Sequence, residues 1–311
     1  NNNGSERGAV NTSGKAKKRF SLRYKLILIF GLLISIASLV EGFLAVRTAR
    51  KAVTEKVEAH LIDKATDVAE VIDGRITAFW QFLEGIARLP LFSDASLSNA
   101  EKIKRLQKEA TFNTDIFELD FSELDGTVHS IDGDAHIGDR EWFQTARSGK
   151  PFISEPLISR TTQKLIQIIA VPIYDNNRQI VGVLSADING LWLSEQIKDI
   201  VVGQTGYAFI LGSTGTNIAH KNTDLVEQRR NVIEKSKTDT ALQSIAEFEK
   251  IAMANSSTSV DFYHYQGEIK ISSYAHLGTT GWTLIISAPQ HEFMGTVNTL
   301  RTSMIGIGVV V

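Results

Sequence analysis

The chain contains no cysteine in its 311 residues. This absence excludes disulfide bonds, zinc–thiolate sites, iron–sulfur clusters and thiol nucleophiles. It also lacks an excess of one charge, because its 33 Lys and Arg residues nearly balance its 35 Asp and Glu residues, and the formal net charge is -2. We therefore expect no nucleic-acid partner. With 43% hydrophobic and 22% charged residues, the chain is long enough and apolar enough for about two folded domains.

Motifs for catalysis and metal binding are absent too. The seven histidines have no HExxH or comparable metal spacing, and no Walker-type loop occurs. Gly212–Gly215 is a turn rather than a nucleophile elbow. We predict that residues 1–311 hold no metal or cofactor and catalyse no reaction. A catalytic domain after residue 311 remains an alternative.

A long apolar run occupies residues 26–46, with Glu41 as its only charge. About twenty such residues form a helix that crosses a bilayer core of roughly 30 Å. Six Lys and Arg residues precede the run between positions 15 and 25, which is typical of the cytoplasmic side. We predict a cytoplasmic basic N-terminus at 1–25 and a transmembrane helix at 26–46. A cleaved signal peptide is the alternative, because Ser35-Ile36-Ala37 resembles a cleavage site.

A second apolar run begins near Met304. We predict that residues 301–311 start a second transmembrane helix and that the chain belongs to a longer protein. The segment between the two runs is then a large folded region outside the cytoplasm.

Hydrophobic periodicity divides that region. Apolar residues at helical spacing, with no proline before Pro90, predict one long stalk helix over 47–90. Alternating patterns and turn residues then predict two antiparallel sheets flanked by helices, one within 91–202 and one within 203–300. The expected fold class is α+β, with both modules attached to the stalk helix. Apolar residues wrap around much of that helix, so we expect it to form a homodimer.

Four segments in this order resemble the double Cache (dCache) sensory domains of bacterial methyl-accepting chemotaxis proteins and related receptors. They are Asp139–Ala146, Val171–Asp187, Gly203–Gly212 with Ile218–His220, and Gly281–Ser287. The resemblance covers roughly residues 47–300. It implies two PAS-like modules, membrane-distal (91–202) and membrane-proximal (203–300), with the ligand in the distal one and the chain in the bacterial cytoplasmic membrane.

The resemblance also implies ligand-binding residues, namely Arg140, Trp142, Phe143 and Asp187. A guanidinium and a carboxylate suit the two charges of a free amino acid, and aromatic rings add apolar and cation–π contact. The tyrosines of the family pattern are missing, since Ala135, Phe143 and an aliphatic residue stand in their places. A purine, an amine or a small carboxylate therefore remains an alternative ligand.

Each of these residues also has a purely structural interpretation. Arg140 could be a solvated first-turn residue behind an Asp139 N-cap, and Trp142 could belong to the core. On a helix, residues two apart do not face each other, so Arg140 and Trp142 share a site only if the helix begins between them. An unpaired Asp187 in an apolar strand would be costly, so it needs a partner.

The function expected from these observations is ligand sensing by a transmembrane chemoreceptor. The alternative is the sensor region of a histidine kinase or diguanylate cyclase. An adhesive surface protein has no repeats or low-complexity segments to support it.

Overall fold

A computed structural model describes residues 21–94, 96–160, 162–295, 299 and 302. Residues 52–295 form one compact unit, and both sheets belong to it. The predicted second apolar run at 301–311 lies outside the described residues, apart from position 302.

The first element of the described residues is helix α1 (Leu22–Ala87), which is unbroken over 66 residues. It therefore includes both the predicted membrane segment and most of the predicted stalk. Its N-terminal part is long and apolar enough to cross a membrane, judged by length and composition. The helix ends just before the 3₁₀ helix η1 (Pro90–Phe92), because a proline disfavours helical geometry in the residue before it.

The distal module contains a seven-stranded antiparallel sheet in the order β3-β2-β1-β7-β6-β4, with β5 also pairing with β6. Its strands are β1 (Ile116–Glu123), β2 (Thr127–Ser130), β3 (Gly133–His136), β4 (Phe152–Ile153), β5 (Leu157–Ile158), β6 (Leu165–Tyr174) and β7 (Ile180–Asn189). Its helices are α2 (Asn99–Ala110), α3 (Glu141–Arg147) and α4 (Trp192–Ile197).

Two hairpins of this module have the Asp, Asn and Gly turn residues that the alternating sequence pattern predicts. Strands β1 and β2 pair across the Asp125-Gly126 turn, where Gly126 has φ +93° and a Cβ would come within 2.7 Å of Gly138 Cα. Strands β6 and β7 pair across a turn in which Asp175 Oδ1 accepts from the backbone N–H groups of Asn177 and Gln179, at 2.8 Å each. Such carboxylate-to-backbone bonds make Asp a preferred turn residue.

The proximal module contains a six-stranded antiparallel sheet in the order β10-β9-β13-β12-β11, with β8 also pairing with β9. Its strands are β8 (Val201–Val202), β9 (Gly206–Leu211), β10 (Asn217–His220), β11 (Ser259–Tyr265), β12 (Glu268–His276) and β13 (Thr283–Pro289). Its helices are α5 (Asp224–Glu227), α6 (Val232–Lys235), η2 (Thr240–Leu242), α7 (Gln243–Ala254) and η3 (Gln290–Phe293).

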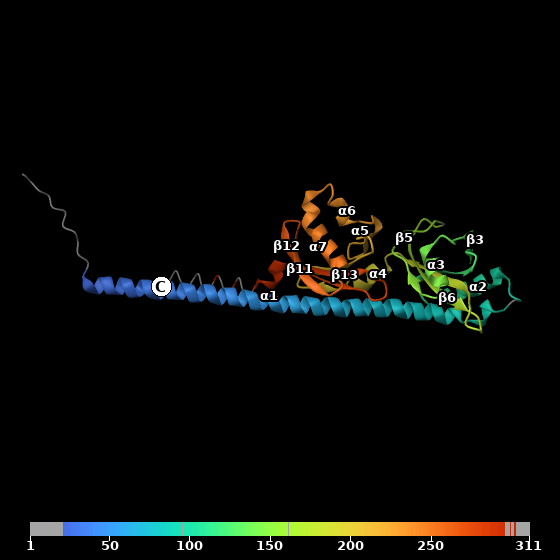
Figure 1. The fold of residues 1–311 in the computed structure, drawn as a ribbon, viewed down its shortest axis with the longest axis horizontal. Helices are drawn as coiled ribbons and strands as arrows, with labels where there is room; N and C mark the ends of the chain where they lie inside the picture. Colours follow the sequence, from blue (N-terminus) through green and yellow to red (C-terminus); the bar gives the residue numbers. More distant parts are fainter. Residues whose placement is uncertain (1–20, 95, 161, 296–298, 300–301, 303–311) are drawn as a thin grey trace, which may run out of the picture. The chain divides into compact units, whose positions relative to one another are not determined.

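The C-terminal half of α1 packs against both modules (Figure 1), and apolar residues of α1 and of both sheets form one continuous core. Leu61 lies beside the proximal module, where its carbonyl oxygen accepts from Ser273 Oγ at 2.7 Å. Further along the helix, Phe79 packs on Trp192 with ring centroids 5.6 Å apart, and Trp80 Nε1 donates to the Phe152 carbonyl at 3.3 Å. The predicted α+β architecture on one long helix is confirmed.

Candidate ligand-binding site

The face of the distal sheet beneath α3 carries three acidic side chains. Glu118 lies opposite Asp187 across the β1–β7 pairing, and Asp120 lies opposite Ser185. Residues directly opposite each other, and residues two apart on a strand, point to the same face of a sheet. The carboxyl groups of Glu118, Asp120 and Asp187 therefore share one face.

Helix α3 contributes two aromatic side chains to this face. Trp142 and Phe143 are buried, with their rings 6.3 Å apart in an edge-on arrangement, and they pack in a cluster with Ile168 and Ala170 of β6. Ile168 lies directly opposite Asp187. The predicted Trp142, Phe143 and Asp187 thus belong to the same layer between sheet and helix, where the two aromatic residues also form part of the core.

Arg140 is the N-cap residue of α3 and has extended backbone angles, φ −81° and ψ 132°. The helix begins at Glu141, between Arg140 and Trp142, so the geometric condition for a shared site is met. The purely structural alternative, in which Asp139 caps the helix, is wrong by one residue. The Asp139 carboxylate lies 4.0 Å from Arg160 Nη2. Within the described residues, no ion pair joins Arg140 to Asp187.

Burial makes this acidic face unusual. It raises the pKa of Asp187 to about 7, with a further contribution from the charge of Glu118. Burial and the charges of Glu118 and Asp187 also raise the pKa of Asp120 well above its ordinary value. Asp120 Oδ1 is buried and has no hydrogen-bond partner in the described part of the chain. Because a carboxylate in a poorly solvated site is stabilised by a nearby positive charge, this face favours a cationic group.

Glu118 and Asp120 are absent from the residues that the sequence suggested. The signal was present, because Ile116–Phe121 alternates apolar and acidic residues, which places both acids on one face of a strand. The missing information was the strand that pairs with β1. Only the β1–β7 register brings the two acids beside Asp187.

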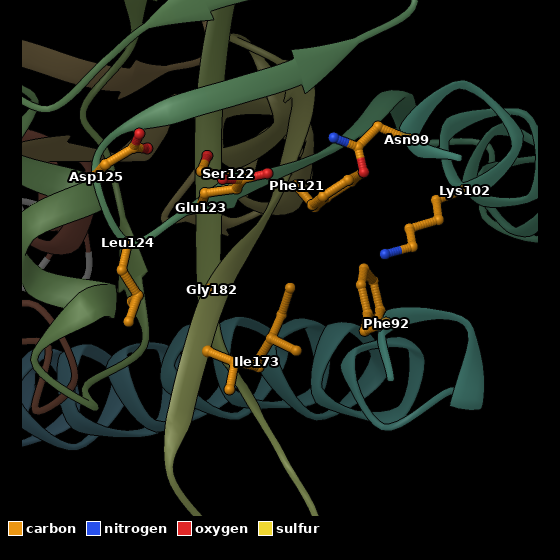
Figure 2. Close-up of a pocket in the computed structure, with 11 residues that line it drawn as sticks. Phe92, Asn99, Lys102, Phe121, Ser122, Glu123, Leu124, Asp125, Ile173 and Gly182 are labelled. Atoms are coloured by element: carbon orange, nitrogen blue, oxygen red, sulfur yellow. The ribbon is translucent and has the colours of Figure 1, made fainter. Parts of the chain in front are cut away.

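An open pocket of about 430 Å³ lies at another place in the distal module. Figure 2 shows Phe92 and Lys102 on one side of it and Leu124 and Asp125 on the other. None of the four predicted site residues lines it. The eleven lining residues are Phe92, Asn99, Lys102, Phe121, Ser122, Glu123, Leu124, Asp125, Ile173, Val181 and Gly182.

A family profile described as a Cache domain, dCache_1, matches residues 45–297. The chain belongs to the Cache family. The matched span covers the second half of α1 and both sheets, so the resemblance carried by the four sequence segments is confirmed.

Relatives of this Cache chain include chemotaxis receptors. One is the methyl-accepting chemotaxis protein PscA of Pseudomonas syringae pv. tomato, 25% identical over 222 residues, which are 68% of this chain and 33% of PscA. The chain spans about a third of the length of the curated relatives it matches.

Solved Cache structures have the same fold. The ligand-binding domain of the Pseudomonas fluorescens chemoreceptor CtaA, in complex with L-isoleucine, matches with a TM-score of 0.62 at 19% identity, over 80% of this chain and 99% of that one. An extracellular domain assigned to a histidine kinase, mmHK1S-Z3, matches with a TM-score of 0.60 at 14% identity, over 78% of this chain and 97% of that one. These likenesses support the two-module fold.

Proposed function

We propose that the chain is the ligand-sensing region of a bacterial transmembrane chemoreceptor, in which the Cache modules lie outside the cytoplasm and the distal module binds a small molecule. The observation that carries the proposal is the half-buried acidic face beneath α3, where no ion pair neutralises Glu118, Asp120 or Asp187 among the described residues. The apolar N-terminal part of α1 and the chemotaxis receptors among the relatives support the membrane role.

The ligand that suits this face best is amino-acid-like. Glu118, Asp120 and Asp187 would hold an ammonium group, and Arg140 at the start of α3 would hold a carboxylate. Charge-assisted hydrogen bonds of this kind contribute about 1.5 to 3 kcal/mol each. A small dicarboxylate fits less well, because three acidic side chains repel it and one arginine attracts it. An amine without a carboxylate remains the second choice.

A thermal-shift screen of amino acids, purines, amines and small carboxylates tests the proposal, since a binder stabilises the fold by mass action. We expect an amino acid to stabilise the 311-residue chain in lipid nanodiscs. Replacing Arg140 or Asp187 by Ala should then weaken that ligand at least about thirtyfold, because each change removes a charge-assisted bond worth about 2 kcal/mol. Arg147→Ala on α3 and Asp199→Ala serve as controls, because both side chains are exposed.

The pattern of losses separates the alternatives. A greater loss from Asp187→Ala than from Arg140→Ala would identify the ligand as an amine. Unchanged affinity in both variants, with the folded state intact, would show that the site is elsewhere.

The alternative is that the chain is the sensor region of a histidine kinase or a diguanylate cyclase. The similarity to mmHK1S-Z3 is the observation that favours this alternative. The two receptor classes share the sensor and differ in the cytoplasmic part. A long heptad hairpin after residue 311 would identify a chemoreceptor, whereas an ATP-binding or cyclase domain would rule that assignment out.

We also propose that the receptor is a homodimer in which α1 contacts α1 of a second copy. The exposed apolar surface of α1 that supports this dimer is smaller than the sequence suggested. In residues 52–87 the apolar side chains of α1 pack mainly on the chain's own sheets, and Val71, 52% exposed, is the one large apolar residue of this stretch that stays exposed. Most of the apolar side chains of α1 on which the dimer prediction rested are therefore buried against the same chain.

A further inference from the structure

The proximal module has its own face of buried polar groups, beneath α7. Tyr207 on β9 lies opposite Ser287 on β13, and Ser287 lies opposite Ser272 on β12, so the three side chains share a face. The hydroxyl of Tyr263 on β11 lies 2.7 Å from Ser287 Oγ. His220 joins them from β10, with its ring 5.0 Å from that of Tyr207.

Helix α7 places a carboxyl group on this face. Glu249 is only 1% exposed, and its Oε2 has no hydrogen-bond partner in the described part of the chain. Burial raises the pKa of Glu249 to about 8, an effect that the charge of Arg230 partly offsets. Buried polar atoms of proteins nearly always have a partner, so this unpartnered carboxyl oxygen can accept a hydrogen bond from a donor that binds beside it.

Arg230 supplies a positive charge to the same region. Its Nη2 donates to Tyr265 Oη at 2.8 Å, and its guanidinium carbon lies 5.7 Å from the Tyr265 ring centroid. Within the described residues this is the only side-chain hydrogen bond of the guanidinium, and no ion pair joins it to Glu249. A guanidinium has five N–H donors, so Arg230 can still bind an anionic group.

A neutral histidine also lies on this face. Burial, with the charges of Arg230 and Lys221, lowers the pKa of His220 to about 4. Its Nδ1 accepts from the Asn222 backbone N–H at 2.8 Å. The proton of the neutral ring is therefore on Nε2, which adds a hydrogen-bond donor to the face.

We propose that the α7-covered face of the proximal module is a second ligand site, which binds a small zwitterion through Glu249 and Arg230. The ligand's ammonium group donates to the carboxylate of Glu249, and its carboxylate accepts from Arg230. Tyr207 provides an aromatic wall, which already holds Lys221 Nζ 4.2 Å from its ring centroid. This site is separate from the acidic face of the distal module and does not depend on it.

Titration calorimetry on the 311-residue chain in lipid nanodiscs tests the proposal, with the twenty L-amino acids and γ-aminobutyrate as probes. We expect at least one probe whose affinity falls at least about tenfold in Glu249→Gln and in Arg230→Gln. The same probe should bind normally to Asp187→Ala, which alters only the distal face. Hydrogen exchange with that probe bound should slow in α7 and β11.

Matched controls are available on neighbouring positions. Glu247→Gln changes an exposed residue of α7, and Arg229→Gln changes the exposed neighbour of Arg230, so both should leave the affinity within about twofold. Arg230→Lys keeps the charge and loses the forked donors, and it provides a milder variant if Arg230→Gln does not fold.

Two results would overturn the proposal. Either no probe binds the parent protein, or every probe that binds keeps its affinity in folded Glu249→Gln and Arg230 variants. Loss of binding in the Asp187 variant together with normal binding in the Glu249 variant would support the distal site alone.

Discussion

At the scale of single residues, the pKa values of carboxyl groups inside the two modules are shifted in the opposite direction from those of carboxyl groups on the surface. Exposed acids such as Asp125 accept backbone hydrogen bonds, which lowers the pKa of Asp125. Glu249 is instead buried and Asp187 half-buried, and the loss of hydration raises the pKa of each. A buried acid that lies close to its own pKa at neutral pH can gain a charge when a cation arrives, and this property suits a binding site.

Glu249 gives a prediction about stability and pH. Its pKa is about 8 in the folded protein and near 4.5 when solvated, so the folded state holds the proton more tightly. The resulting stabilisation is complete below pH 4.5 and is lost as the pH rises through 8. Glu249→Gln cannot ionise. Between pH 6 and pH 9 we therefore expect the difference in unfolding free energy between variant and parent to change by about 3 kcal/mol in favour of the variant.

Thermal and denaturant unfolding of both proteins across this pH range checks the difference, with Glu247→Gln as the control. Taking the difference between variant and parent cancels groups that titrate alike in both proteins. The groups that interact directly with the Glu249 carboxyl are Arg230, Tyr207 and Tyr263. Parallel stability curves for Glu249→Gln and the parent would contradict the buried, protonated acid.

At the scale of elements, α1 is the support to which both sheets attach. Besides apolar packing, a specific polar contact fixes the proximal sheet on it. Asp73 Oδ2 accepts from the Gly278 backbone N–H at 2.6 Å, and Asp73 Oδ1 accepts from the Thr279 backbone N–H at 3.1 Å and from Thr279 Oγ1 at 2.5 Å. The carboxylate therefore ties the β12–β13 turn to the helix.

Removing this carboxylate should loosen the module. We expect Asp73→Ala to lower the free energy of unfolding by about 2 kcal/mol, because hydrogen bonds to a charged group contribute about 1.5 to 3 kcal/mol. Asp67→Ala, an exposed acid six residues earlier on α1, should cost less than about 0.5 kcal/mol. Urea unfolding measures both values, and equal losses would mean that the Asp73 contacts add nothing.

At the scale of the whole molecule, the modules contact each other as well as α1. Glu155 of the distal module accepts from the backbone N–H and hydroxyl of Ser213 in the proximal module, at 2.7 and 2.9 Å. The His220 backbone N–H donates to Ser194 Oγ of α4 at 3.2 Å. A change in the distal module can therefore reach the proximal module and α1 through packed contacts.

We expect ligand binding to shift α1 by about 1 to 2 Å relative to its neighbours, the usual scale for packed helices. Because the chain has no cysteine, Val71→Cys introduces a single thiol on the exposed side of α1. A disulfide between two copies would support the proposed dimer, and a ligand-dependent rate of its formation would support the shift. Lys108→Cys on α2 is the control.

Two outcomes would count against this whole-molecule proposal. If Val71→Cys forms no dimer in nanodiscs at high protein concentration, α1 is not the contact. If the disulfide forms at the same rate with and without a saturating ligand, α1 does not move at this position.

Features that depend on local pattern could be predicted from the amino-acid order. A proline-free apolar periodicity specified α1 up to the residues before Pro90, and alternation with Asp-Gly and Asp-Asn turns specified the β1–β2 and β6–β7 hairpins. The short strands β3, β4, β5, β8 and β10 were missed, because two to four residues carry too little periodicity.

Contacts between side chains far apart in the chain could not be predicted in this way, because they depend on how the folded segments pair. Glu118 and Asp187 are 69 positions apart, and the β1–β7 register alone makes them neighbours. Arg140 and Asp187, by contrast, suggested a charge pair in sequence, and no such ion pair occurs among the described residues. Glu249 looks like an ordinary helix-surface acid until the proximal sheet covers it. Local sequence fixes backbone conformation and face, whereas burial and charge environment arise from contacts between segments that the local pattern does not relate.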